Sequence, residues 1–305
     1  MILCVGEILV DMIGCERNGA FCYERKAGGA PFNVACAIKK FGGSSAFCGC
    51  VGDDVIGDYL KTFAASRGLD GLYVSTDKTR NTTLAFVDID SRGERSFCFY
   101  RKETADYRLP DIDDELFDRA NIIHIGSLML SEDIGREYAD KLTERAKRAG
   151  KIVSFDVNYR TDIFRDKDTA IGLYKRCIDR ADIVKLSEDE YEIFGAEYVA
   201  GLKDKLVCVT LGSKGSRWLY GGKTGSVGTI AVKPIDTTGA GDAFYAGLLK
   251  MADGVDRRDY TDEFLNGALY YANVCGALNT LGRGAIDCLP DAATVDEYVK
   301  KFAGD

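Results

Sequence analysis

Short apolar runs recur along this chain of 305 residues, and stretches with helical periodicity lie between them. None of the runs alternates cleanly with polar residues, which is typical of parallel strands that are buried on both faces. Strands are predicted over Ile2 to Val5, Ala46 to Val51, Ile122 to Ile125, Ile152 to Phe155, Ile183 to Leu186 and Leu206 to Leu211. Helices are predicted over Pro31 to Phe41, Val55 to Arg67, Ile134 to Ala149 and Thr169 to Arg180. Because strand and helix alternate, we expect an α/β fold with a doubly wound, mostly parallel sheet flanked by helices.

Two segments interrupt this alternation. Thr82 to Arg101 is predicted to be a hairpin with its turn at Ser91 to Gly93, and Asp11 to Arg25 is irregular but strand-like. These segments, about 11–25 and 82–101, are expected to form a small β-sheet that covers the main sheet as a lid. No repeat, low-complexity tract or long linker divides the sequence, so we expect one domain over residues 1–305.

Composition limits the class of partner and the compartment. The 48 acidic residues outnumber the 40 basic ones, so nothing in the overall charge favours nucleic acid or an anionic membrane, and small molecules are the expected ligands. Eleven cysteines, including Cys48 and Cys50, lie mostly in apolar stretches and are expected to be reduced thiols of a cytoplasmic protein. No targeting or membrane segment is expected. His124 is the one histidine, which gives little support to a histidine metal site or a histidine-based triad.

The stretch "IDTTGAGDAFYAGLL", Ile235 to Leu249, carries the clearest chemical signal. Gly239, Ala240 and Gly241 lack bulk, so their amides can converge on a phosphate at the start of the following helix. A carboxylate would repel that phosphate, and Asp242 therefore suits this position as a base that takes a proton from an attacking hydroxyl group. The spacing alone leaves open that Asp242 is an ordinary helix cap.

Two familiar nucleotide motifs do not fit the sequence. "GAGDAF" has Phe244 where a dinucleotide fingerprint needs its third glycine. "GGKT", Gly221 to Thr224, has Arg217 at the first glycine position of a Walker A motif, and no helical run follows it. We expect Gly221 to Thr224 to be a hairpin turn.

Asp236 to Asp242 matches the form D-T-x-G-A-G-D, and "AGGAPFNVA", Ala27 to Ala35, has a Gly-Gly pair followed by an asparagine. Through these motifs the chain resembles the PfkB, or ribokinase-like, carbohydrate kinase family. Strings such as "GEILVDMI", "FYRKETAD" and "FDVNYR" resemble fructokinases within it. The resemblance implies a ribokinase-like fold and an ATP-dependent kinase that phosphorylates D-fructose at its 6-hydroxyl group. A 2-keto-3-deoxygluconate kinase and a catalytically silent sugar-binding protein are the alternatives.

The resemblance also implies a role for individual residues. Asp242 would be the catalytic base, and the amides of Gly239, Ala240 and Gly241 would form an anion hole. The residues that would bind the sugar are Asp11, Gly28, Gly29, Asn33, Arg101 and Arg160. Those that would bind ATP are Lys185, Thr210, Gly212, Gly215, Asn273 and Gly284.

Metal sites and a dimer are implied in the same way. The family commonly has an N-x-x-E motif that is tied to magnesium, whereas this chain has "SEDE" with Ser187 in place of the asparagine. Glu190 would therefore bind magnesium through water. Asp236 and Thr238 would belong to a site for a monovalent cation such as potassium. A homodimer that pairs through the lid sheets is also implied.

Overall fold

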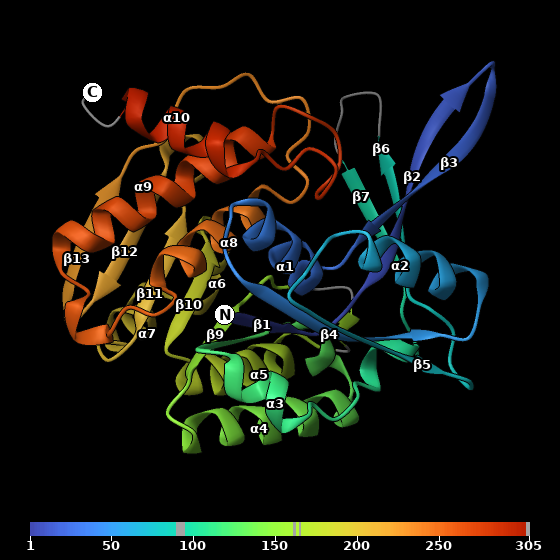
Figure 1. Cartoon of the computed structure of the whole chain (residues 1–305), viewed down its shortest axis with the longest axis horizontal. Helices are drawn as coiled ribbons and strands as arrows, with labels where there is room; N and C mark the ends of the chain where they lie inside the picture. Colours follow the sequence, from blue (N-terminus) through green and yellow to red (C-terminus); the bar gives the residue numbers. More distant parts are fainter. Residues whose placement is uncertain (90–94, 161–162, 165, 303–305) are drawn as a thin grey trace.

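The predicted apolar runs form neighbouring strands of one nine-stranded sheet in the computed structural model, which describes residues 1–89, 95–160, 163–164 and 166–302 (Figure 1). Their order across the sheet is β13-β12-β11-β10-β9-β8-β1-β4-β5. The bounds are β1 (Ile2–Val5), β4 (Ser45–Gly52), β5 (Gly71–Asp77), β8 (Ile122–Ile125), β9 (Ile152–Asp156), β10 (Ile183–Ser187), β11 (Leu206–Thr210), β12 (Ser216–Tyr220) and β13 (Lys223–Val227). Each pair of neighbouring strands from β11 to β5 in this order is parallel. Strand β12 pairs antiparallel with both β11 and β13. The predicted mostly parallel sheet is confirmed.

Helices cover both faces of this sheet (Figure 1). One layer contains α1 (Ala30–Lys40), α2 (Val55–Ala65), α8 (Ala240–Ala252), α9 (Asp262–Asn279) and α10 (Ala292–Phe302), and the other contains α3 (Asp114–Arg119), α4 (Asp133–Arg148), α5 (Lys167–Arg180), α6 (Glu188–Phe194) and α7 (Ala196–Gly201). Short 3₁₀ turns lie at Ala105–Tyr107, Leu128–Ser131, Gly212–Lys214 and Arg257–Asp259. Successive residues of β1 pack into opposite layers, Ile2 and Cys4 into one and Leu3 and Val5 into the other. Since both faces of the sheet are buried, its strands show no polar alternation.

A second, four-stranded sheet lies beside the main one and is called the small sheet here (Figure 1). It consists of β2 (Leu9–Arg17), β3 (Ala20–Gly28), β6 (Leu84–Ile89) and β7 (Arg95–Tyr100), in the order β3-β2-β6-β7. The predicted hairpin within Thr82 to Arg101 is confirmed by the antiparallel pairing of β6 and β7, and its predicted turn at Ser91 to Gly93 lies outside the described residues.

The strand-like character predicted for Asp11 to Arg25 is confirmed, but the predicted irregularity is wrong. The segment belongs to a long regular hairpin of β2 and β3. The two residues between the strands, Asn18 and Gly19, both have positive φ, 52° and 76°. An Asn-Gly pair favours this tight turn because both residues tolerate the left-handed backbone conformation, and that local signal was overlooked.

The structure also places the predicted hairpin turn, two of the cysteines and the histidine. Gly221 and Gly222 form the turn between β12 and β13, as predicted for "GGKT". Cys48 and Cys50 are buried on β4 as free thiols. His124 is a core residue whose Nδ1 lies 3.1 Å from the Ser154 hydroxyl. Among the described residues, we find no helix with the length and apolarity to cross a bilayer.

The direction of the winding reverses between β1 and β8. From β1 the chain continues outward through β4 and β5, whereas β8 to β11 follow one another on the other side. In a doubly wound sheet, ligands bind in the crevice at the carboxyl ends of the strands where the order reverses. The topology therefore places a ligand site at the ends of β1 and β8.

Candidate active site

A cavity of about 300 Å³ lies at this crevice. It brings together eight of the predicted site residues, namely Asp11, Gly29, Asn33, Arg160, Lys185, Gly239, Gly241 and Asp242, and the predicted cation-site residue Thr238. We call it the sugar cavity, after the ligand that the sequence predicts.

A second cavity of about 460 Å³ contains five more predicted residues, Thr210, Gly212, Gly215, Asn273 and Ala240. Gly241 and Thr237 line both cavities. The two spaces therefore meet at the glycine loop, which is the arrangement that transfer of a group between two ligands requires.

The glycine loop owes its shape to Gly239, which precedes α8. Its φ is 74°, and a Cβ atom at this position would lie 2.6 Å from the Cβ of Ala285. Only glycine fits here without strain. The Ala240 amide donates to the Thr237 carbonyl at 3.2 Å. Amides in the first turn of a helix have no partner four residues earlier, and the helix dipole there favours an anion.

Asp242 lies in the first turn of α8, and its Oδ2 accepts a hydrogen bond of 2.8 Å from the Asn33 side chain of α1. The pKa of Asp242 is raised to about 6, chiefly by burial and also by Asp156, while Asn33, Lys185 and Arg160 oppose the rise. A carboxyl group with such a pKa can accept a proton near neutral pH. Gly239 is the helix cap, so the interpretation of Asp242 as an ordinary cap does not hold.

Lys185 places a positive charge beside the loop. Its Nζ donates to both carboxylate oxygens of Asp156, at 2.8 and 2.9 Å, and both side chains are buried. Burial lowers the pKa of Lys185, but Asp156, Glu190 and Asp242 raise it, and the net change is upward. The ammonium group therefore stays charged, and a Cβ atom on Gly241 would lie 3.4 Å from its Nζ.

The Gly-Gly pair makes room for the residues around it. A Cβ atom on Gly28 would lie 2.5 Å from Oδ2 of Asp11, and one on Gly29 would lie 2.4 Å from the Glu7 carbonyl oxygen. Gly29 also has a φ of 109°, which side chains rarely allow. Because these two residues have no side chains, α1 can begin close to the residues that follow β1.

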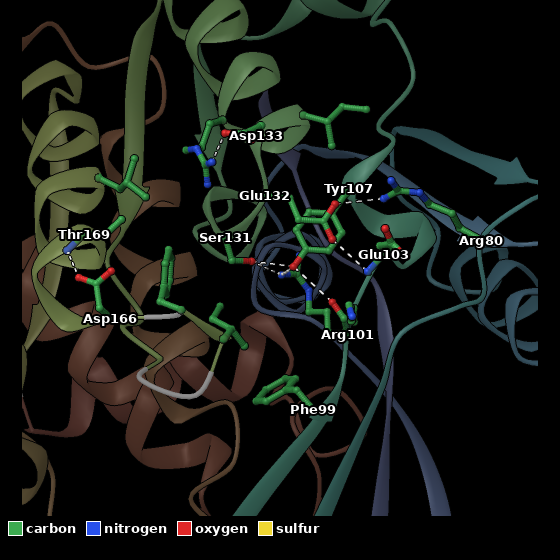
Figure 2. A pocket seen from close by; sticks show the side chains of 16 residues that line it. Arg80, Phe99, Arg101, Glu103, Tyr107, Ser131, Glu132, Asp133, Asp166 and Thr169 are labelled. Atoms are coloured by element: carbon green, nitrogen blue, oxygen red, sulfur yellow. Dashed lines mark hydrogen bonds and ion pairs between the residues drawn. The ribbon is translucent and has the colours of Figure 1, made fainter.

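Arg101 does not line the sugar cavity. It lies in an adjoining cavity of about 810 Å³ (Figure 2). Its guanidinium donates to Asp106 at 2.5 and 2.8 Å, and also to the Tyr107 hydroxyl, the Ser131 hydroxyl and the Leu128 carbonyl at 2.5, 3.0 and 2.7 Å. Protein groups therefore already engage this guanidinium.

The comparisons with known proteins agree with this geometry. The profile of the pfkB family carbohydrate kinases matches residues 1–292. The chain belongs to the pfkB family. Fructokinase-2 of Oryza sativa subsp. japonica is 36% identical over 320 residues, which cover 99% of this chain and 95% of the rice protein. This pfkB-family chain is an ATP-dependent sugar kinase.

Solved structures of fructokinases superpose on nearly the whole chain. A fructokinase from Xylella fastidiosa with bound ATP has a TM-score of 0.92 at 30% identity and covers 99% of this chain and 98% of its own. A fructokinase from Vibrio cholerae O395 with bound fructose, ADP and calcium ion has a TM-score of 0.87 at 32% identity, with 97% and 98% covered. The predicted ribokinase-like fold is confirmed.

The residues predicted to bind metal lie outside or at the edge of the sugar cavity. The two oxygens of Glu190 accept the amides of Tyr159 and Ser187, at 2.6 and 2.7 Å. Asp236 accepts the amides of Thr238 and Gly284, at 2.8 and 3.0 Å, and so ties the glycine loop to the segment before α10. Among the residues that the structure describes, no three His, Cys, Asp or Glu side chains cluster as a metal site.

Two acidic residues of the site were missed by the sequence reasoning. Asp156 holds Lys185, and Glu7 lines the sugar cavity. Both follow or end a buried strand, within "FDVNYR" and "GEILVDMI". A charged residue at or within two residues of the carboxyl end of a buried parallel strand was the signal that could have identified them.

Proposed function

We propose that this kinase phosphorylates D-fructose at its 6-hydroxyl group and forms fructose 6-phosphate. The observation that carries the proposal is the engagement of Arg101 by Asp106, because a 2-keto-3-deoxygluconate kinase would need a guanidinium available for the substrate carboxylate. The carboxylate of Asp11 and the amide of Asn33 suit a neutral sugar, since they hydrogen-bond hydroxyl groups. The similarity to fructokinases supports the same substrate.

One observation favours the alternative substrate. Arg160 does line the sugar cavity, where it could accept the carboxylate of 2-keto-3-deoxygluconate. The two substrates therefore have to be separated by experiment.

In the proposed reaction, Asp242 takes the proton of the attacking hydroxyl group while the amides of the glycine loop hold the phosphoryl oxygens. Lys185 adds positive charge beside the loop and so offsets the charge that develops there. Thr210, Gly212, Gly215 and Asn273 would bind the nucleotide in the second cavity.

Magnesium would offset phosphate charge when it is bound. Glu190 fits a contact through water, because each carboxylate oxygen retains a lone pair beyond the one that accepts a backbone amide. Asp236 and Thr238 are proposed for a monovalent cation, such as potassium, that would brace the glycine loop.

The purified protein should be assayed with ATP, magnesium and a panel of sugars and sugar acids. We expect kcat/KM for fructose to exceed that for 2-keto-3-deoxygluconate by about a hundredfold, since a wrong substrate leaves buried polar groups unpaired. A preference for the sugar acid would reject fructose and retain the kinase, and phosphorylation of no sugar would reject both.

We also propose that two copies pair through the small sheet. Phe21 and Tyr100 are each 63% exposed and belong to a chain of edge-to-face rings that includes Tyr23 and Phe86. Aromatic clusters of this kind favour a protein partner. Sedimentation of Phe21→Ser should show a monomer where the unaltered protein shows a dimer, and a monomer in both cases would reject the pairing. The cytoplasmic location stays a prediction from the cysteine content.

A further inference from the structure

The sugar cavity contains a third acidic side chain, Glu7, besides Asp11 and Asp242. Glu7 follows β1 at the point where the winding of the sheet reverses, and it is only 1% exposed. Within the part of the chain that the structure describes, neither of its carboxyl oxygens has a hydrogen-bond partner.

The other buried acidic side chains nearby all have donors. Asp106 accepts from Arg101, Thr83 and Thr104, while Asp156 is paired with Lys185 and Glu190 accepts two backbone amides. A buried polar group without a partner costs free energy, so it is uncommon unless something else satisfies it. Glu7 is the exception in this group, and it is the one that faces the cavity.

The surroundings confine the Glu7 carboxyl group. A Cβ atom on Gly126 would lie 2.8 Å from its Oε2, and one on Gly29 would lie 2.4 Å from its main-chain oxygen. The carboxyl group therefore needs a glycine at position 126, and the main chain of Glu7 needs one at position 29. A confined group of this kind is already oriented before a ligand binds.

The charges around Glu7 allow both protonation states near neutral pH. Its pKa is raised to about 7, chiefly by burial and also by Asp106 and Asp242, while Arg101 and the main-chain amide of Glu7 itself oppose the rise. As a carboxylate it can accept two hydroxyl hydrogen bonds, and as an acid it can donate one and accept others. Sugar hydroxyl groups both donate and accept, so they match either state.

We propose that Glu7 binds the sugar substrate directly, by hydrogen bonds to hydroxyl groups other than the one that is phosphorylated. The attacking hydroxyl group would lie at Asp242 beside the glycine loop, which leaves the other hydroxyl groups of the sugar for Glu7. The inference rests on the proposed function in one respect, since it takes the substrate to be a polyhydroxylated sugar. Glu7 is then a residue that sets specificity for that sugar.

The test compares Glu7→Gln with Glu132→Gln. Glu132 is a half-buried carboxylate of the adjoining cavity that pairs with Arg80, and it serves as the matched control (Figure 2). We expect Glu7→Gln to raise KM for the sugar at least tenfold and to leave KM for ATP within twofold. The melting temperature of the sugar-free variant should not fall, because burial disfavours the ionised carboxyl group and neither of its oxygens accepts a hydrogen bond among the described residues. Glu132→Gln should keep the sugar KM of the unaltered enzyme.

Deoxy sugars then identify the hydroxyl group that Glu7 recognises. In the unaltered enzyme, one of the 1-, 3- and 4-deoxyfructoses should lose at least tenfold in kcat/KM relative to fructose. In Glu7→Gln, kcat/KM for the same analogue should approach kcat/KM for fructose, because the analogue's penalty came from the lost contact with Glu7. A purely structural role of Glu7 would not produce this selective loss.

Three results would overturn the inference: an unchanged sugar KM, the same penalties for all analogues in both proteins, or a parallel rise of both KM values with a lower melting temperature.

If Glu7→Gln does not fold, Glu7→Asp, which withdraws the carboxyl group by one carbon, is compared in its place. If another sugar has the highest kcat/KM, its own deoxy analogues are used, so a failure of the fructose assignment and a failure of the Glu7 contact are told apart. If nothing is phosphorylated, calorimetric sugar affinities of the two proteins decide.

Discussion

Replacing Asp242 by asparagine should impair catalysis and stabilise the fold at the same time. The asparagine retains the size of the side chain and an oxygen that can accept the hydrogen bond from Asn33. It cannot take a proton from the attacking hydroxyl group. A positioned general base contributes about two to four orders of magnitude to turnover, and we expect kcat to fall by that amount.

The gain in stability follows from the pKa of Asp242. The folded protein raises this pKa from 3.8 to about 6, which means that the fold disfavours the ionised form. At about 1.4 kcal/mol for each pKa unit, ionisation of the native aspartate costs about 3 kcal/mol. Because the cavity admits water to part of this residue, we expect a measured gain of about 1 to 2 kcal/mol in the free energy of unfolding.

The dependence on pH gives the sign of this effect. Below the unfolded pKa of 3.8 the aspartate is protonated in both states and carries no penalty. The penalty grows as the pH rises from the unfolded pKa of 3.8 to the folded pKa of about 6, and it is complete above that value. The advantage of Asp242→Asn should therefore be full at pH 8 and about half as large at pH 5.

Urea unfolding at pH 5 and pH 8, together with steady-state assays, would test this reasoning. Near-normal kcat in the folded variant would remove Asp242 from the mechanism. A variant less stable than the unaltered protein at pH 8 would show instead that the carboxylate is a structural partner of Asn33.

Further predictions concern the loop, the buried ion pair and the small sheet. Gly239→Ala should lower the free energy of unfolding by about 2 kcal/mol, because its Cβ atom would meet Ala285 at 2.6 Å and φ is positive; urea unfolding measures this, and an unchanged midpoint would contradict it. Lys185→Met should destabilise the protein by about 3 to 5 kcal/mol and raise KM for ATP, since it leaves Asp156 as an uncompensated buried charge; retention of both values would speak against the ion pair. Hydrogen exchange of the β6 and β7 amides should slow when the sugar is added, as expected of a lid, and equal protection with and without sugar would reject closure.

The parts of the fold that were predicted correctly are those encoded by local patterns. Strands buried on both faces are continuous apolar runs, and their helices begin and end at recognisable residues such as Pro31 and Gly150. The strand Gly71–Asp77 was missed because it lies at the edge of the sheet, where partial exposure permits polar residues. The hairpin of β2 and β3 was underestimated because its Asn-Gly turn was overlooked.

The sequence by itself determined the family, and it located the glycine loop and Asp242, for which we propose phosphate binding and base catalysis. These depend on contiguous residues, because a glycine turn followed by a helix makes an anion site wherever it occurs. Only the tertiary structure decided which polar side chains are hydrogen-bonded to other protein groups and which can still bind a ligand. Asn33 and Asp242 bond across 209 residues, Arg101 is held by Asp106, and Glu7 has no partner among the described residues. A hydrogen bond forms only between groups that the fold brings within about 3 Å, so the use of each side chain is settled by which distant segments meet.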